Sequence, residues 1–176
     1  METKQEHGFR YARYHSFFCL MRGNGNSAHF RCTLAMLLFL DFDGVLHPYT
    51  RPAGALVHVP ALERVLRDFP DVDIVISSAW REAHTLEQLR AFFSEDIAQR
   101  IVGVTPQLDS WKHPFIREAE IHTWLRNAGR ASENWVALDD IAPFFSPGCQ
   151  NLLLVHTDVG FDAAADHELR RRFSLS

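Results

Sequence analysis

The sequence has few cysteines, no long apolar run and no excess of positive charge, and each absence argues against a class of protein. Its three cysteines, Cys19, Cys32 and Cys149, are odd in number and follow no pattern, which favours a reducing compartment, the cytoplasm, over a disulfide framework. The apolar run at 34–40 is far shorter than the roughly 20 residues that cross a bilayer. A formal charge of −4 gives no bulk electrostatic reason to bind nucleic acid, although it leaves room for a local basic strip.

Ten histidines are present, but none stands in an H-x-H or H-E-x-x-H arrangement, so the sequence disfavours a transition-metal site made of histidines. The apolar content of 47% and the charged content of 23% are ordinary for a soluble globular protein. At 176 residues the chain is most simply one domain with a substantial core.

One stretch, MLLFLDFDGVLHP at positions 36–48, organises the rest of the chain. Its first five residues are apolar, which predicts a strand buried on both faces of a parallel sheet. The run ends at Asp41, and Asp43 follows two residues later, so in an extended chain both carboxylates project to the same side. Gly44 then permits a sharp turn or a close backbone approach. Because open α/β sheets bind ligands at the carboxyl ends of their strands, the pattern predicts a pocket with two acids rather than a solvated turn.

Strands and helices alternate along the rest of the chain. This order predicts a single doubly wound, Rossmann-like α/β fold: a parallel sheet of about five strands with helices on both faces. Each expected strand is a short apolar run, and each expected helix has apolar residues at helical spacing. The strands are expected at 36–40, 72–76, 101–104, 135–138 and 151–155, and the helices at 60–69, 86–93, 115–127 and 162–173.

The sequence LDFDGVL at 40–46 resembles the first motif of the haloacid-dehalogenase-like (HAD) superfamily, whose members are mostly magnesium-dependent phosphohydrolases. The resemblance extends over residues 36–173. It implies that Asp41 is the nucleophile and Asp43 the general acid and base. Within the superfamily, the chain is most similar to the HAD domain of Swiss-army-knife-type RNA repair proteins, on the strength of SAWR at 78–81, RxxEI at 117–121 followed by Trp-Leu, and WVALDD at 135–140.

The second predicted strand is followed by SSAWR at 77–81, which resembles the second motif of the superfamily. That motif implies a hydroxyl group that hydrogen-bonds a phosphoryl oxygen. Ser77 and Ser78 compete for this role, and Ser78 is preferred because serine before a small residue and tryptophan is a familiar variant. Trp80 and Arg81 would stand beside the pocket, where one can stack and the other can hold an anion. The alternative for both is a structural role at the end of the strand.

The third motif of the superfamily supplies a lysine at the start of a helix, and here the chain departs from the pattern. Arg117 aligns with that position, at the opening of the helix expected over 115–127. An arginine offers phosphate a two-pronged fork in place of a point charge. Lys112, in the loop just before the helix, is the alternative.

Another apolar strand ends in a pair of acids, Asp139 and Asp140, which resembles the fourth motif. The resemblance implies that Asp41, Asp139 and the backbone carbonyl of Asp43 bind Mg²⁺ directly, with Asp140 bound directly or through water. The chemistry of these residues leads to the same expectation. Four converging carboxylates repel and raise one another's pKa values, and Mg²⁺ prefers hard oxygen ligands, so the pattern implies a divalent cation.

Residues 1–35 differ from the rest, because they mix basic, aromatic and Gly/Asn residues without a sustained period. The GNGNS sequence at 23–27 is a loop signal. We expect this segment to be a disordered or optional extension that precedes a domain over 36–176. The alternative is a basic arm that contacts a polynucleotide through aromatic residues and arginines at 10, 13, 22 and 31.

The expected function is a magnesium-dependent phosphatase that acts through an aspartyl-phosphate intermediate. The connections between the motifs leave no room for a full cap domain, and an uncapped pocket is open to a large phosphorylated substrate such as a nucleic-acid end. A small-metabolite phosphomonoesterase is one alternative. A non-catalytic binding or regulatory module is the other, but such modules usually lose an acid of the first motif, and both acids are present here.

Overall fold

The computed structural model describes residues 36–175, so the expectations for residues 1–35, an optional extension or a basic arm, lie outside the described residues. The described chain contains a five-stranded sheet with the order β3-β2-β1-β4-β5, and every neighbouring pair is parallel. None of its helices is both long enough and apolar enough to cross a membrane. The strands are β1 (Met36–Leu40), β2 (Val72–Ile76), β3 (Ile101–Val104), β4 (Asn134–Asp139) and β5 (Leu152–Leu154).

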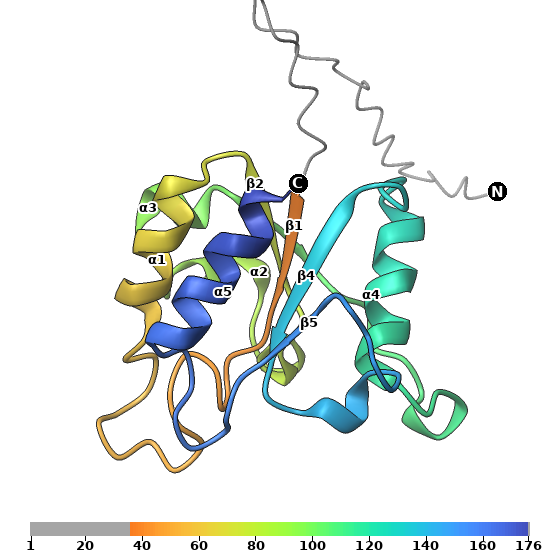
Figure 1. Ribbon diagram of the computed structural model, residues 1–176. Coiled ribbons are helices and arrows are strands. Elements are labelled where there is room, and N and C mark those ends of the chain that lie inside the picture. The colour runs from red at the N-terminus through yellow and green to blue at the C-terminus, as the bar shows by residue number, and fades with distance from the viewer. Residues whose placement is uncertain (1–35, 176) are drawn as a thin grey trace, which may run out of the picture. The chain divides into compact units, whose positions relative to one another are not determined.

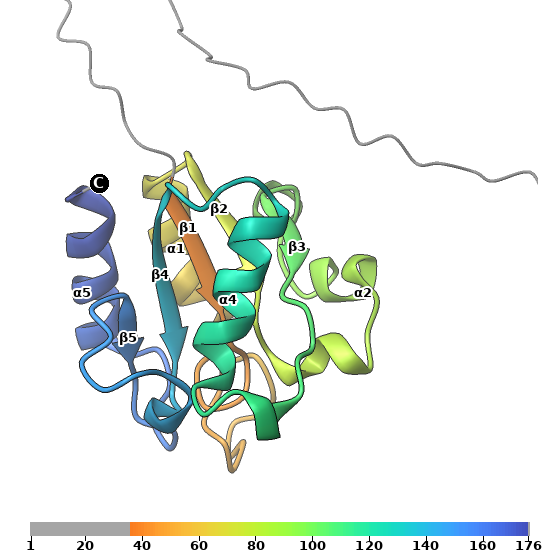
Figure 2. The same cartoon turned by 90° about the vertical axis from the view of Figure 1, so that its right-hand side faces the viewer.

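The central strand β1 is buried along its whole length and contributes to two hydrophobic cores in alternation. Met36, Leu38 and Leu40 belong to the larger core, which includes α1 (Val59–Asp68) and α5 (Ala163–Ser174). Leu37 and Phe39 belong to the smaller core, which includes α4 (Ile116–Asn127). Figures 1 and 2 show α1 and α5 on one face of the sheet and α4 on the other. The predicted α/β sheet with helices on both faces is therefore confirmed.

Helix ends follow the local sequence signals. The N-terminal end of α2 (Leu86–Arg90) carries the capping box between Thr85 and Gln88. Gly129 follows α4 with a φ of +69°, and the Arg130 N–H bonds the Leu125 carbonyl at 2.8 Å, which closes the helix with a Schellman motif.

The helix expected over 86–93 is shorter than the sequence predicts, because α2 ends at Arg90. The backbone bonds tighten after Arg90: the Phe92 N–H donates to the Leu89 carbonyl and the Phe93 N–H to the Arg90 carbonyl, each three residues back. The next N–H, that of Ser94, donates to the carboxylate of Glu63 on α1 at 2.7 Å. The chain then starts again as α3 (Glu95–Ala98). Phe93 is nevertheless buried, so its apolar character correctly predicted a core position, although the residue lies outside the helix.

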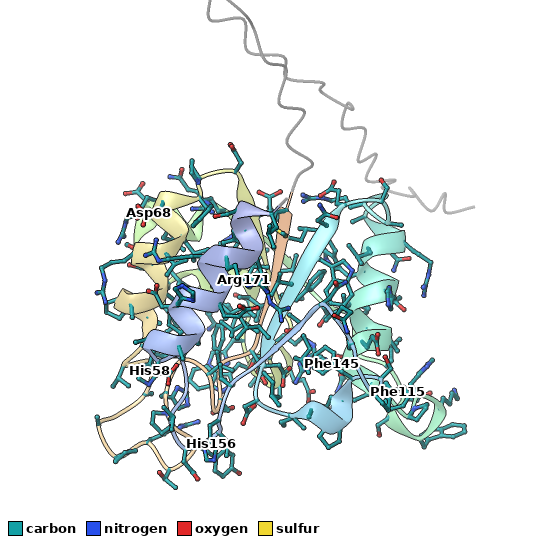
Figure 3. The ribbon with its side chains drawn as sticks, viewed as in Figure 1. His58, Asp68, Phe115, Phe145, His156 and Arg171 are labelled. Carbon is teal, nitrogen blue, oxygen red and sulfur yellow. The ribbon has the colours of Figure 1, made fainter. Side chains whose placement is uncertain are left out.

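Because all five strands run the same way, their carboxyl ends meet at one edge, the lower edge in Figure 1. Within 36–175 this edge is built from loops and three short 3₁₀ helices, and no separate domain is inserted between the strands: η1 (Ala79–Glu82), η2 (Ser110–Lys112) and η3 (Ala142–Phe144). Figure 3 shows the labelled side chains of Phe115 and His156 at this same edge.

Candidate active site

The register between β1 and β4 makes Asp41 and Asp139 neighbours. Leu40 lies opposite Leu138, and the Asp41 N–H donates to the Leu138 carbonyl at 3.1 Å. One residue further along, Asp41 and Asp139 continue the alternation of Phe39, which faces the α4 side of the sheet. Both side chains are buried. The strand pairing itself therefore brings the two acids together on the side of the sheet that carries α4.

Asp140 joins this pair because Gly44 leaves room for it. Gly44 has a φ of +71°, which favours glycine, and a Cβ atom at this position would lie 2.0 Å from Asp140 Oδ2. One carboxylate oxygen from each of Asp41, Asp139 and Asp140 lies within 4.8 Å of the others. The turn and close approach expected at Gly44 are both observed, and they permit a cluster of three acids.

Burial and mutual repulsion make this acid cluster electrostatically unfavourable. Burial raises the pKa of Asp41, and the nearby Arg117 only partly offsets this. Burial together with the negative charge of Asp41 raises the pKa of Asp139 to about 8, again against the effect of Arg117. Buried carboxylates with raised pKa values in an open edge of the sheet are typical of functional sites.

Arg117 lies in the first turn of α4 and reaches this cluster. Its Nη2 is 3.6 Å from Asp41 Oδ2, and its Nε is 3.3 Å from Asp139 Oδ2. The guanidinium also packs over the ring of Phe144, 5.6 Å from its centroid. Only 6% of Arg117 is exposed, so the positive charge is directed at the acids rather than at solvent.

Lys112, the alternative for the third motif, is placed differently. Its ammonium group pairs with Asp109 at 2.6 Å and lies over the ring of Trp111, and about half of its side chain is exposed. Of the two cations that the sequence offered, the structure brings Arg117 to the acids.

Ser78 is the serine that contacts Asp41. It is fully buried, and its hydroxyl hydrogen-bonds the carboxylate and holds the pKa of Asp41 lower than burial alone would. Its oxygen also accepts a hydrogen bond from the backbone N–H of Trp80 at 3.4 Å. Ser77 extends the pairing of β2 with β1 through its backbone, because its N–H donates to the Leu40 carbonyl at 2.9 Å. The preference for Ser78 over Ser77 agrees with this geometry.

Arg81 is bound to protein groups. Its Nη1 donates to the carbonyls of Ser77 and Ser78 at 2.6 and 2.8 Å, and its Nη2 pairs with the buried carboxylate of Glu120 at 2.7 Å. Glu120 lies three residues after Arg117 on the same helix and also accepts the Leu108 N–H. These contacts favour the structural alternative for Arg81, a brace between the end of β2 and α4.

The side chain of Asp43 stands apart from the acid cluster. Although burial alone would raise its pKa, hydrogen bonds from Arg51, Trp80 and His47 outweigh burial and hold the pKa below its usual range. Trp80 is the only one of these donors that the motifs single out. His47 and Arg51 were missed, because their approach to Asp43 depends on how the loop after β1 folds back.

Within residues 36–175, several buried atoms of the cluster make no hydrogen bond: Asp139 Oδ2, Asp140 Oδ1, and Nε and Nη1 of Arg117. Asp139 Oδ2 and Arg117 Nε form an ion pair at 3.3 Å but no hydrogen bond. Buried polar atoms are nearly always hydrogen-bonded, so these atoms without a hydrogen bond suggest a missing ligand. Two of these atoms are carboxylate oxygens, which suit a hard divalent cation. The others are guanidinium donors, which suit an anion. The residues present therefore fit a magnesium ion with a phosphoryl group beside it.

Comparison with protein families finds a match over most of this domain. Residues 37–165 match the family described as the HAD domain in Swiss Army Knife RNA repair proteins. No curated protein and no solved structure shows significant similarity to the chain.

Proposed function

Since the chain belongs to the family of HAD domains found in Swiss Army Knife RNA repair proteins, we propose that it is a magnesium-dependent phosphatase that acts on phosphorylated polynucleotide ends. The family is one of phosphohydrolases. The observation that carries the proposal is the convergence of three carboxylates and one buried guanidinium at the edge of the sheet. The odd number of unpatterned cysteines favours a cytoplasmic setting.

Asp41 is the proposed nucleophile. Its Oδ1 accepts the Phe42 N–H at 2.8 Å, which orients the carboxylate, and its Oδ2 faces Arg117. In the first step, Asp41 attacks phosphorus in line; a bond from phosphorus to a carboxylate oxygen forms as the bond to the leaving oxygen breaks. Attack requires the ionised carboxylate. The positive charge of Arg117 and the hydroxyl of Ser78 favour that form against the effect of burial.

Asp43 is the proposed general acid and base. Because its hydrogen bonds keep it ionised in the free protein, Asp43 would take the proton of the phosphomonoester monoanion and pass it to the leaving oxygen in the first step. In the second step it would take a proton from water as the water oxygen bonds to phosphorus and the bond from phosphorus to Asp41 breaks. Asp43 follows the nucleophile by two residues, as the first motif of the superfamily implies for this role. Its carboxylate is partly exposed. It is therefore accessible to both a substrate oxygen and water.

Asp41, Asp139 and Asp140, with the backbone carbonyl of Asp43, are the residues that would hold Mg²⁺. When bound, the ion would supply positive charge to the phosphoryl oxygens and relieve the repulsion among the acids. Arg117 Nη1, which makes no hydrogen bond within residues 36–175, is a donor free to bind a phosphoryl oxygen. Ser78 would be the second donor once its hydroxyl, which donates to Asp41 in the free protein, turns toward the phosphoryl oxygen.

An open site supports a large substrate. Within residues 36–175, the connections at the carboxyl edge hold short helices and loops, with no domain that could close over a small molecule. The family description points to RNA repair as the setting. A polynucleotide end would bring binding energy from nucleotides remote from the reacting phosphate.

Phosphate release from oligonucleotides and small esters tests this proposal. The wild-type chain should hydrolyse a 3′- or 5′-phosphorylated oligonucleotide with a kcat/KM at least about tenfold above that for ribose 5-phosphate, because remote contacts add binding energy. Both activities should disappear in EDTA and return with magnesium. A preference for ribose 5-phosphate would instead favour a small-metabolite phosphatase. Magnesium binding without turnover of any ester would favour the binding-module alternative.

Magnesium should stabilise the protein more as the pH rises from about 4 to about 8. The pKa of Asp139 is about 8 in the folded protein against an ordinary value of 3.8, so the metal-free fold loses the stability linked to this group as the pH rises across that window. Metal binding displaces the proton, and the apparent affinity should therefore rise by up to about tenfold per pH unit until the carboxyl is ionised.

Thermal midpoints measured between pH 5 and pH 9, with and without magnesium, check this expectation. Asp139→Asn is the matched control, because it cannot ionise and should lose both the pH dependence and most of the stabilisation by magnesium. A magnesium effect that is independent of pH in the wild type would contradict the assignment of Asp139 as a ligand.

A further inference from the structure

The Asp43 carboxylate is held by side chains from two separate elements. On one side, Trp80 in η1 donates its indole N–H to Oδ2 at 2.7 Å. On the other, His47 and Arg51 from the segment after β1 contact Oδ1, at 3.0 Å from His47 Nε2 and 2.6 Å from Arg51 Nη2. With each oxygen bound to a donor on a different element, the carboxylate cannot rotate without breaking a hydrogen bond.

Toward Asp43, His47 can act only as a hydrogen-bond donor. It is fully buried, and its Nδ1 accepts the Leu56 N–H at 3.1 Å, so Nδ1 carries no proton. The ring proton must then sit on Nε2, where it points to Asp43 Oδ1. Arg51 Nε also lies 3.1 Å from His47 Nε2, but a ring nitrogen that carries a proton does not accept a hydrogen bond. Arg51 therefore contacts Asp43 through Nη2, which donates to Oδ1. The backbone at Leu56 thus selects the tautomer that orients the carboxylate.

Trp80 is equally constrained. Its ring meets Phe42 and Phe92 edge to face, with 5.5 Å between centroids in each pair, and stacks on His84 with an interplanar angle of 18°. The ring position also follows from Ser78, which caps η1 and starts the turn that carries Trp80. Packing therefore holds the indole N–H in one direction, toward Asp43.

We propose that Trp80 and His47 are positioning residues for Asp43, which aim its carboxylate at the leaving oxygen of the substrate. This inference rests on the proposed phosphatase function, in which Asp43 is the acid. The sequence assigned Trp80 only a stacking or packing role and assigned His47 none. A carboxylate free to turn would meet the leaving oxygen in the correct orientation less often, and that loss falls on proton transfer and not on the attack by Asp41.

Leaving groups of different basicity separate this role from mere packing. A nitrophenolate leaves without help, whereas a more basic phenolate needs the proton. The Trp80→Phe variant keeps a ring in place but removes the N–H donor. We expect kcat/KM to fall by about tenfold or more for phenyl phosphate and by less than about threefold for 4-nitrophenyl phosphate, since a positioned acid matters only for the poorer leaving group.

His47 provides a second pair of variants. His47→Gln can still donate to Asp43 and accept from Leu56, so it should keep the wild-type ratio between the two esters, whereas His47→Leu should show the loss on phenyl phosphate. Trp111→Phe is the matched control, since the Trp111 ring is 80% exposed and contacts Lys112. It should leave the ratio unchanged. In an Asp43→Asn background, Trp80→Phe should have no further effect on either ester.

The results that would overturn the inference differ from those that would overturn the function. Equal losses on both esters in Trp80→Phe, or an added loss in the Asp43→Asn background, would mean that Trp80 serves packing only. If Trp80→Phe does not fold, a wild-type ratio in folded His47→Leu would overturn the inference just as clearly. Failure of the wild type to hydrolyse either ester would reject the phosphatase proposal itself, and this inference with it.

Discussion

Replacing Asp41 by asparagine is expected to lower kcat/KM by at least about a thousandfold, a loss of roughly 4 kcal/mol of transition-state stabilisation. The change keeps the shape of the side chain but removes the charge and the nucleophilic oxygen. Asp41 lies in a buried site where Phe42 orients one oxygen and Arg117 faces the other, so the variant removes the one carboxylate that is held in this way. Phosphate release from 4-nitrophenyl phosphate in magnesium measures the effect.

The same variant should fold. The three clustered carboxylates repel one another, and removing one lowers that repulsion in the metal-free protein, although it also removes the contact with Arg117. We therefore expect a thermal midpoint near that of the wild type without magnesium and a much smaller increase when magnesium is added. Asp43→Asn is the comparison: it should also lose most activity but keep the response to magnesium. A folded Asp41→Asn variant with near wild-type turnover would exclude the aspartyl-phosphate mechanism.

Replacing Arg117 by methionine is expected to lower kcat/KM by about a hundredfold or more, the usual effect of removing a preorganised donor to a developing charge. It should also destabilise the metal-free protein by about 3 kcal/mol, because it leaves buried carboxylates without their cation. Magnesium should restore part of the stability, since it replaces the missing positive charge, but little of the activity. Thermal midpoints and initial rates, each with and without magnesium, separate the two effects.

Lys112→Met is the matched control for Arg117. Lys112 ends η2, just before the helix that carries Arg117, and its ammonium group pairs with Asp109 near the surface. We expect its activity on small esters to stay within about threefold of the wild type, as for other surface substitutions away from the site. Arg117→Lys should recover only part of the activity, because an ammonium group lacks the planar fork of the guanidinium. Equal losses in the two methionine variants would contradict the position assigned to Arg117.

These two predictions depend on one structural arrangement. The acids come from β1 and β4, whereas the cation comes from α4, which packs on the smaller core. The brace between Arg81 and Glu120 ties α4 to the end of β2 and so helps to keep Arg117 in place. The site is consequently sensitive to how one helix sits on the sheet as well as to its own residues.

The sequence by itself determined the fold class and the place of the acids. Apolar runs that end in Asp41 and in Asp139-Asp140 predict buried strands, and parallel strands carry their ends to the same edge. Local signals also predicted the capping box at Thr85 and the helix end at Gly129, because such caps depend on residues only a few positions apart. These features need no knowledge of distant contacts.

Only the tertiary structure decided which cation serves which acid. Arginine and lysine side chains are long and flexible, so their sequence positions leave several partners within reach. The packing of α4 directs Arg117 inward and leaves Lys112 at the surface, and the buried Glu120 draws Arg81 away from solvent. The donors around Asp43 depend on the fold of a loop rich in turns. A side chain's partner is set by the shape of the whole chain around it, and a motif a few residues long cannot encode that shape.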